Sequence, residues 1–228
     1  MIGIIGAMQA EVDGLIGKIV DLKTERFGGF DFAAGRIGSN EVVVVRCGMG
    51  KVNAAVCAQT LILRYHPEVV INTGVAGSLS QALGILDVAV ATDAVQHDYD
   101  TSAMGEPNGA LTINGEFVTF LPCDATWREK LLTAAKTVGV KCAPARIASG
   151  DQFISRAEDK RRIVQRFDAQ VCEMEGGAIA QTCCLSNTPC AILRVISDST
   201  DGNHSMEFAK FLPLAVENSF KILMEVLK

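Results

Sequence analysis

The chain has 228 residues, 49% of them hydrophobic and 21% charged, with a formal net charge of -5 at pH 7. This composition predicts one globular domain, residues 1–228, with a substantial core and without the basic surface that binds DNA or RNA. The apolar runs fall short of the roughly 18 residues that span a bilayer, and no secretory pattern follows Met1, so we expect a cytoplasmic protein that makes no membrane contact and binds a small molecule.

Runs rich in valine and isoleucine alternate with segments of helical period, which is typical of an α/β domain with a central, mostly buried sheet. In chain order, the expected strands cover residues 2–6, 41–46, 69–73, 88–91, 145–148, 170–172 and 190–196. The expected helices cover residues 11–19, 53–65, 124–138, 158–165, 175–185 and 206–227. Residues 96–115 lack periodicity and are expected to form an irregular loop or an arm that contacts a partner.

Clusters of cysteine and of basic residues have ordinary structural interpretations. The eight cysteines include no CxxC pair and several lie in apolar segments, which favours buried free thiols over disulfides in a chain without a secretory signal. No histidine shares a ligand spacing with a cysteine, so we expect no metal site. The basic run Lys160, Arg161 and Arg162 is expected to be the solvated face of a helix.

Ligands of an open α/β sheet bind at the carboxyl ends of its strands. Carboxylates, glycines and methionines gather just after the expected strands. They occupy residues 6–8 with Glu11, then 47–50, 72–77, 149–154, 173–175 and 197–198. We therefore expect these segments to face one cleft.

Asp198 follows the apolar strand that ends at Ile196 and precedes a polar stretch, residues 199–204. A carboxyl group backed by a hydrophobic strand can remain protonated long enough to give its proton to a leaving group. The same position also suits an aspartate in a turn or at a helix start. The residue alone does not decide between these interpretations.

Glu11 and Glu175 each lie at the start of an expected helix, where unpaired backbone amides and the helix dipole stabilise a negative charge. That structural interpretation does not require the Glu-Met-Glu sequence that ends at Glu175. Gly176 and Gly177 behind it allow close approach of the backbone to a ligand. A carboxylate that accepts two hydrogen bonds would suit the paired hydroxyls of a ribose.

Two glycine-rich segments, residues 48–50 and 74–77, are candidates for a phosphate cradle, but neither fits GxGxxG or GxxxxGK[ST]. Contact of the main chain with a sugar is the interpretation that we favour. Phe153 is a candidate to stack on a purine base. Met8, Met49 and Met174 suit an apolar or sulfur-bearing substrate, although such residues are also common in cores.

Taken together, these segments resemble the methylthioadenosine/S-adenosylhomocysteine nucleosidases of the nucleoside phosphorylase superfamily, over nearly the whole chain. The motifs that carry the resemblance stand in the family's order. They are Ile4-Ile5-Gly6-Ala7-Met8 with Glu11, Gly48-Met49-Gly50-Lys51-Val52, Asn72-Thr73-Gly74 with Ala76-Gly77, Ser149-Gly150-Asp151 with Phe153-Ile154, Glu173-Met174-Glu175, and Arg194 with Ile196-Ser197-Asp198.

The resemblance implies a single-domain, three-layer fold with a central mixed sheet flanked by helices. It also implies hydrolysis of the N-glycosidic bond of 5′-methylthioadenosine, S-adenosylhomocysteine and 5′-deoxyadenosine, without a metal or an organic cofactor. Asp198, supported by Ser197, would protonate N7 of adenine, and Glu11 would direct the attacking water with Arg194 nearby. The implied substrate contacts are Glu175 and Met174 on the ribose, Phe153 and the Ile154 backbone on adenine, Met8 and Phe208 around the 5′ group, and Met49, Val75, Ala76 and Gly77 along the cleft.

Two positions depart from the family pattern. Val75 stands where relatives often have a serine that helps to hold the water. Met104 stands where relatives often place an aromatic residue of the neighbouring subunit against the 5′ group. The resemblance implies that residues 101–111 form part of a homodimer contact that completes the neighbour's site.

Three alternatives remain open at this point. A phosphorylase of the same superfamily would use phosphate in place of water, although such enzymes usually carry an arginine where this chain has Asn72. A second alternative is a nucleosidase for aminodeoxyfutalosine, whose 5′ group is larger. The third, a binding protein without activity, is disfavoured because Glu11, Glu175 and Asp198 are all present.

Overall fold

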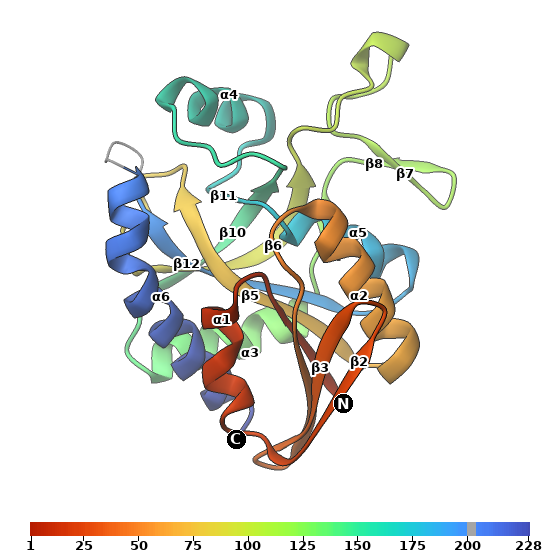
Figure 1. Cartoon of the computed structure of the whole chain (residues 1–228). Coiled ribbons are helices and arrows are strands. Elements are labelled where there is room, and N and C mark those ends of the chain that lie inside the picture. Colours follow the sequence, from red (N-terminus) through yellow and green to blue (C-terminus); the bar gives the residue numbers. More distant parts are fainter. Residues whose placement is uncertain (200–203) are drawn as a thin grey trace.

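A mixed β-sheet forms the centre of the structure, a computed structural model that describes residues 1–199 and 204–228, with side chains described outside 200–207. The sheet strands are β1 (Ile2–Gly6), β2 (Val20–Phe27), β3 (Phe30–Ile37), β4 (Asn40–Arg46), β5 (Val69–Ser78), β6 (Val88–Gln96), β9 (Leu121–Pro122), β10 (Cys142–Ser149), β11 (Val171–Glu173) and β12 (Cys190–Asp198). They lie in the order β11, β10, β6, β12, β5, β1, β4, β3 and β2, with β9 paired to β6 (Figure 1). Strands β7 (Leu111–Ile113) and β8 (Glu116–Val118) form a separate hairpin.

The sheet partly closes on itself beside Gly77. Strand β5 is parallel to β12, β12 is antiparallel to β6, and β6 continues through β10 to β11. Strand β11 then pairs with β5 in the antiparallel sense. As a result Gly77 is paired with Cys172 on one side and with Asp198 on the other, so the ends of three strands meet at one point.

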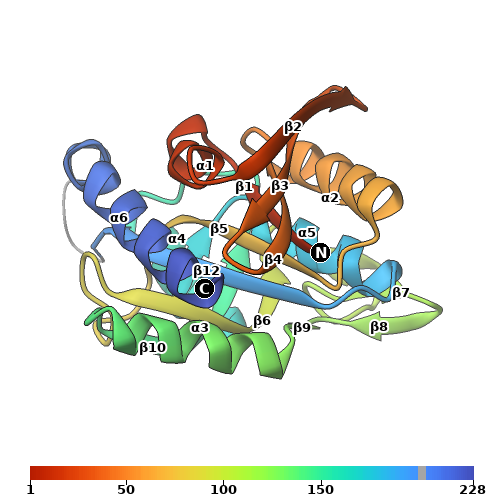
Figure 2. The same ribbon diagram turned by 90° about the horizontal axis from the view of Figure 1, so that it is seen from below.

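Helices cover both faces of the sheet. They are α1 (Gln9–Ile16), α2 (Lys51–Tyr65), α3 (Ala125–Thr137), α4 (Ala157–Phe167), α5 (Gly176–Leu185) and α6 (His204–Val226). Helices α1, α3 and α6 share one apolar core with the sheet, whereas α2 and α5 share the other (Figure 2). This arrangement confirms the predicted α/β fold with a central mixed sheet flanked by helices.

Helix α4 stands apart from these layers, beyond the carboxyl ends of the strands (Figure 1). Its Ile163 and Phe167 pack in a third apolar cluster with Val95, Ala148 and Ile154. Burial of the thiols is also confirmed for Cys47, Cys57, Cys172 and Cys190. No helix in the described residues is long and apolar enough to cross a membrane.

The predicted strands are all present, but the element list was incomplete. Strands β2, β3, β7, β8 and β9 were not predicted, and the residues of β2 are nearly all exposed. Strand β5 continues past Thr73 to Ser78, since residues 73–77 keep pairing with β12 in spite of their glycines. Residues 96–115 are mostly irregular, as predicted, and contain one short 3₁₀ helix, η1 (Ser102–Met104), and strand β7.

Candidate active site

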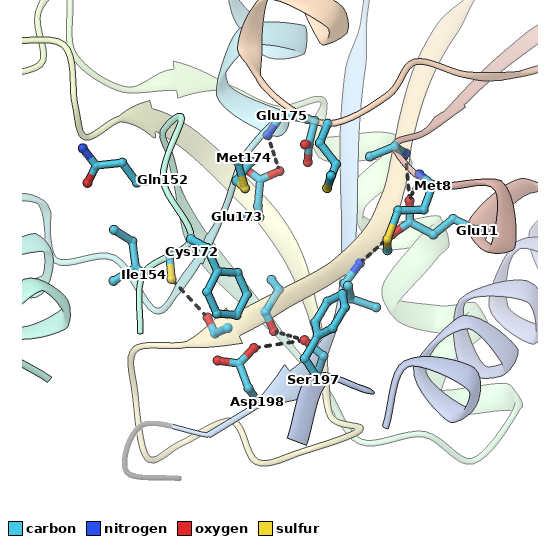
Figure 3. A pocket seen from close by; sticks show the side chains of 17 residues that line it. Met8, Glu11, Gln152, Ile154, Cys172, Glu173, Met174, Glu175, Ser197 and Asp198 are labelled. Atoms are coloured by element: carbon cyan, nitrogen blue, oxygen red, sulfur yellow. Dashed lines mark hydrogen bonds between the residues drawn. The ribbon is translucent and has the colours of Figure 1, made fainter. Parts of the chain in front are cut away.

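A cleft opens where β1, β5, β11 and β12 end (Figure 3). Its walls come from the segments that the sequence placed at strand ends. The lining residues are Ala7, Met8, Glu11, Met49, Val75, Ala76, Gly77, Gln152, Phe153, Ile154, Cys172, Glu173, Met174, Glu175, Ser197, Asp198 and Phe208. All the predicted site residues line this cleft except Arg194 and Met104.

Glu11 joins the first turn of α1 to strand β5. One carboxylate oxygen accepts hydrogen bonds from the amides of Ala7 (2.7 Å) and Met8 (2.9 Å), and the other accepts one from the Val75 amide (3.2 Å). Burial raises the pKa of Glu11, although these hydrogen bonds and Arg194 act in the opposite direction. A Cβ atom at Gly74 would lie 2.8 Å from this carboxylate, so a glycine is required for its close approach.

Arg194 lies behind the cleft rather than on its surface. The side chain is 1% exposed and donates to Glu173 at 2.5 Å and to the side chain of Asn72. The prediction that Arg194 lies near the attacking water stays a prediction, and its guanidinium is held by these two side chains. Asn72 also donates to the carbonyl of Ile5 at 3.0 Å, so its amide joins β5 to β1.

Glu173 is the acidic residue that caps α5. It accepts hydrogen bonds from the amides of Glu175 (3.0 Å) and Gly176 (2.7 Å) and from the hydroxyl of Ser149. Burial opposes its ionisation, but Arg194 and these hydrogen bonds hold its pKa below the usual value. The carboxylate that stabilises the start of α5 is therefore that of Glu173, and not that of Glu175 as the sequence suggested.

Glu175 is consequently available for a ligand. Its carboxylate accepts a hydrogen bond from the Gly50 amide at 2.9 Å and makes no cap hydrogen bond to its own helix. Burial, together with the negative charge of Glu173, raises the pKa of Glu175 to about 7. A carboxyl group that ionises near neutral pH responds readily to positive charge that develops beside it.

Asp198 ends β12 and is 1% exposed. The hydroxyl of Ser197 donates to its Oδ1 at 3.0 Å. Its Oδ2 lies 2.9 Å from the position that a Cβ would take at Gly77, so the glycine creates the space for the carboxyl group. The polar stretch predicted after Asp198 falls mostly on residues 200–203, outside the described residues.

The basic run on α4 is only partly a solvated face. Arg161 and Arg162 are exposed, as predicted, but Lys160 is 4% exposed, so the prediction is wrong for that residue. The cause is helical spacing, because Lys160 shares the inner face of α4 with Ile163 and Phe167 at positions three and seven residues further on. Its ammonium group lies 3.5 Å from Oδ2 of Asp198.

Apolar side chains surround the acidic groups. The rings of Phe153 and Phe208 meet edge to face, with centroids 6.1 Å apart. Ile154 is buried, while Phe153 and Met49 remain exposed. Figure 3 shows Ser197 and Asp198 on one side of the cleft, with Glu175 and Glu11 across from them; Met174 lies beside Glu175, and Met8 beside Glu11.

Met104 does not line the cleft of its own chain. It lies in η1, on the irregular arm, and is 78% exposed. Four lining residues were also missing from the predicted set, namely Ala7, Gln152, Cys172 and Glu173. Each is a sequence neighbour of a predicted residue or lies in the same strand-end segment, which is the signal that would have identified them.

Comparison with known proteins places this geometry among related structures. Residues 1–228 match the family model described as the phosphorylase superfamily. The 5′-methylthioadenosine/S-adenosylhomocysteine nucleosidase of Shewanella loihica is 36% identical over 229 residues, which span 100% of this chain and 98% of the relative.

Solved structures agree with this match. The nucleosidase of that name from Neisseria meningitidis, in complex with methylthio-immucillin-A, has a TM-score of 0.94 at 34% identity, with coverage of 100% of this chain and 98% of the other. The futalosine hydrolase of Helicobacter pylori has a TM-score of 0.92 at 34% identity, with coverage of 99% and 96%.

Proposed function

The chain belongs to the phosphorylase superfamily. Because it is similar over its whole length to 5′-methylthioadenosine/S-adenosylhomocysteine nucleosidases, we propose that it hydrolyses 5′-methylthioadenosine and S-adenosylhomocysteine. The reaction cleaves the N-glycosidic bond and releases adenine and a 5-substituted ribose. 5′-Deoxyadenosine is a further expected substrate. This membership also confirms the family resemblance drawn from the sequence.

The observation that carries the proposal is the arrangement of Asp198, Glu11 and Glu175 around one apolar cleft. Glycosidic cleavage passes through a state in which the sugar is cationic and the leaving group needs a proton. An acid on one side and two carboxylates across from it meet both needs, since a positioned acid contributes about 10²–10⁴-fold. Water is then the only co-reactant.

The roles of individual residues follow from this arrangement. Asp198, with Ser197, gives its proton to N7 of adenine, and Glu11 directs the water. Val75 has no hydroxyl, but its backbone amide donates to Glu11 at 3.2 Å, so in our proposal Glu11 holds the water without a serine. The remaining substrate contacts are those of Glu175, Met174 and Met49 with the ribose, of Phe153, Ile154, Ala76 and Gly77 with adenine, and of Met8 and Phe208 with the 5′ group.

The electrostatics of the cleft favour water over phosphate. No arginine side chain lines the cleft within the described part of the chain, and Arg194 behind it is paired with Glu173. A phosphate dianion would instead approach Glu11 and Glu175, which disfavours its binding.

The test is to incubate the purified protein with each nucleoside in phosphate-free buffer and to quantify the products. We expect adenine and a free 5-substituted ribose. Product that forms only after phosphate is added, and as a ribose 1-phosphate, would show that the enzyme is a phosphorylase.

Aminodeoxyfutalosine is a second candidate substrate, because a futalosine hydrolase has a TM-score of 0.92 to this chain. The same assay decides between them when the nucleosides are compared by kcat/KM. A preference for aminodeoxyfutalosine would reassign the main substrate while leaving the chemistry unchanged.

We also propose that the enzyme is a cytoplasmic homodimer. Its cysteines are free thiols, the state that a reducing compartment maintains. The arm of residues 101–111 carries the exposed Met104 away from its own cleft, which suits a role in completing the cleft of a partner subunit.

A further inference from the structure

Lys160 on α4 is a buried lysine whose ammonium reaches the carboxyl ends of two strands. It donates to the backbone carbonyl of Ser78 at 3.1 Å and to that of Ser199 at 2.7 Å. The ammonium also lies 3.5 Å from Oδ2 of Asp198. Both side chains of this ion pair are almost fully buried, 5% and 2% exposed.

The charged groups near this ammonium identify Asp198 as its ion-pair partner. On α4 itself, Asp159 is paired with the exposed Arg156 and Arg162. Strand β11 contributes the neutral thiol of Cys172, whose pKa is raised by burial to about 12. Among the described residues, the carboxylate within ion-pair distance of the Lys160 ammonium is that of Asp198.

A buried ammonium is costly unless it is paired and hydrogen-bonded. Two carbonyl oxygens satisfy part of its hydrogen-bonding capacity but carry no net charge. The negative charge that offsets the remaining cost is the one on Asp198 when that residue is ionised. An ionised Asp198 is also the state that proton transfer to adenine leaves behind.

We propose that Lys160 is a positioning residue for the general acid, an inference that rests on the proposed function of Asp198. The ammonium faces Oδ2 at ion-pair distance while Ser197 donates to Oδ1, so each carboxyl oxygen has a polar neighbour that orients it. The ammonium also stabilises the carboxylate that forms as the proton leaves, which lowers the energy of the transition state.

The proton balance does not require Lys160 to lose its proton. The O–H bond of Asp198 breaks and an N7–H bond forms, while the electrons of the glycosidic bond pass to adenine. Water adds to the sugar carbon and gives its proton to Glu11. Asp198 is then a carboxylate beside an ammonium, and solvent restores both carboxyl groups to their starting states.

The test compares Lys160→Gln and Lys160→Met with Arg161→Met, a control that removes a positive charge from the exposed face of the same helix. Glutamine retains a donor for the two carbonyl oxygens but has no charge, so it guards against loss of folding in the methionine variant. For 5′-methylthioadenosine we expect kcat to fall about 10- to 100-fold in both Lys160 variants, the size typical of a lost charge-assisted contact, with KM within about threefold. Arg161→Met should match the wild type.

A second substrate separates support of the acid from a structural role. A 5-methylthioribosyl 4-nitrophenyl glycoside has a leaving group that departs without protonation. We expect Lys160→Gln to cleave this compound at nearly the wild-type rate. Equal slowing of both substrates would mean that Lys160 only maintains the structure, and wild-type kcat on 5′-methylthioadenosine would mean that its charge is not used.

Asp198→Asn distinguishes this proposal from the function on which it rests. We expect that variant to lose most turnover on 5′-methylthioadenosine while it still binds the nucleoside, measured by calorimetry. If Asp198→Asn keeps wild-type turnover, the general-acid assignment fails and the role of Lys160 fails with it. If Asp198→Asn is inactive but Lys160→Gln is fully active, only the role of Lys160 is overturned.

Discussion

The pKa values of Glu173 and Glu175 are shifted in opposite directions although the two residues lie close together. Glu173 is ionised because Arg194 and several hydrogen bonds compensate for its burial. That fixed charge then contributes to the raised pKa of about 7 at Glu175. Glu175 is therefore partly neutral without substrate and is drawn toward ionisation by the cationic ribose of the transition state, where its charge is most useful.

Glu175 should make the stability of the substrate-free enzyme depend on pH. Its folded-state pKa of about 7 lies above the ordinary value of 4.5, so its contribution to stability is greatest below pH 4.5 and declines as pH rises through 7. Glutamine cannot ionise. We expect the difference in unfolding free energy between Glu175→Gln and wild type to move in favour of the variant over this range, by at most about 3 kcal/mol.

Urea unfolding of both proteins between pH 5 and about pH 8.5 measures this difference. Glu41→Gln is a suitable control, because Glu41 is an exposed residue on β4. A difference between Glu175→Gln and wild type that does not change with pH would contradict the raised pKa.

Residue identity and strand-end position were enough to predict most of the cleft, but not what lies behind it. Arg194 is held by Glu173 and Asn72 on the inner side of the cleft, partners that its place in the sequence did not indicate. The depth of a side chain depends on which neighbours satisfy it, and sequence spacing does not specify those neighbours. The burial of Lys160 was missed for a different reason, because its spacing from Ile163 and Phe167 does indicate the buried face of α4 but was not used.

Hydrogen bonds connect three segments at the start of α2: the first residue of that helix, the loop after β10 and the loop after β6. The carboxylate of Asp151 accepts a hydrogen bond from the Lys51 amide at 2.7 Å, in place of the side-chain cap that Gly50 lacks. Asp98, after β6, accepts from the Lys51 ammonium at 2.6 Å and from the Asp151 amide at 2.9 Å. The loop that carries Phe153 is thereby tied to the segment that contacts Glu175.

Loss of this tie should affect substrate binding more than chemistry. In Asp98→Asn the ion pair with Lys51 is lost while the side chain keeps its size, so the loop of residues 150–154 gains mobility. We expect KM for 5′-methylthioadenosine to rise about fivefold, equivalent to about 1 kcal/mol, with kcat within about twofold. Steady-state kinetics measure both constants, and Asp21→Asn, which weakens an exposed ion pair with Arg36, is the control.

An equal loss of kcat and kcat/KM in Asp98→Asn would instead mean that the contacts of Asp98 stabilise the transition state. That outcome would contradict a role limited to binding.

At the scale of elements, the strands that are buried along their whole length were predicted, whereas several partly or wholly exposed strands were missed. Strand β1 is buried along its whole length and was assigned correctly. Strand β2, which pairs with β3 beyond the main core, has exposed residues at nearly every position. Hydrophobic period reports burial, so a strand held mainly by backbone pairing gives no such signal.

Exposed large apolar side chains are spread over several segments of the described chain, including β2 with Val20, Leu22 and Phe27. Val52, Val56 and Leu63 are exposed on α2, and Met104 and Phe117 are exposed on the arm and on β8. A large contiguous exposed apolar patch is typical of a surface that binds another protein. A second copy of the chain is the occupant that fits our proposal, since the arm lies outside its own cleft.

Mixing two inactive variants tests whether the cleft is shared between subunits. Met104→Asp should impair the cleft of the neighbour, whereas Asp198→Asn impairs the cleft of its own chain. In a mixed dimer, one cleft carries both changes and the other carries neither. Co-refolding equal amounts should therefore restore roughly a quarter of the wild-type activity, because half of a random mixture is mixed dimer with one intact cleft of two.

Recovery should disappear when the two proteins are assayed side by side without exchange of subunits, and sizing by light scattering should give a dimer mass. An active monomer would rule out the shared cleft. A dimer without recovery would mean that the arm of residues 101–111 does not reach the neighbouring site, so that the 5′ group of the substrate is recognised by Met8 and Phe208 of a single chain.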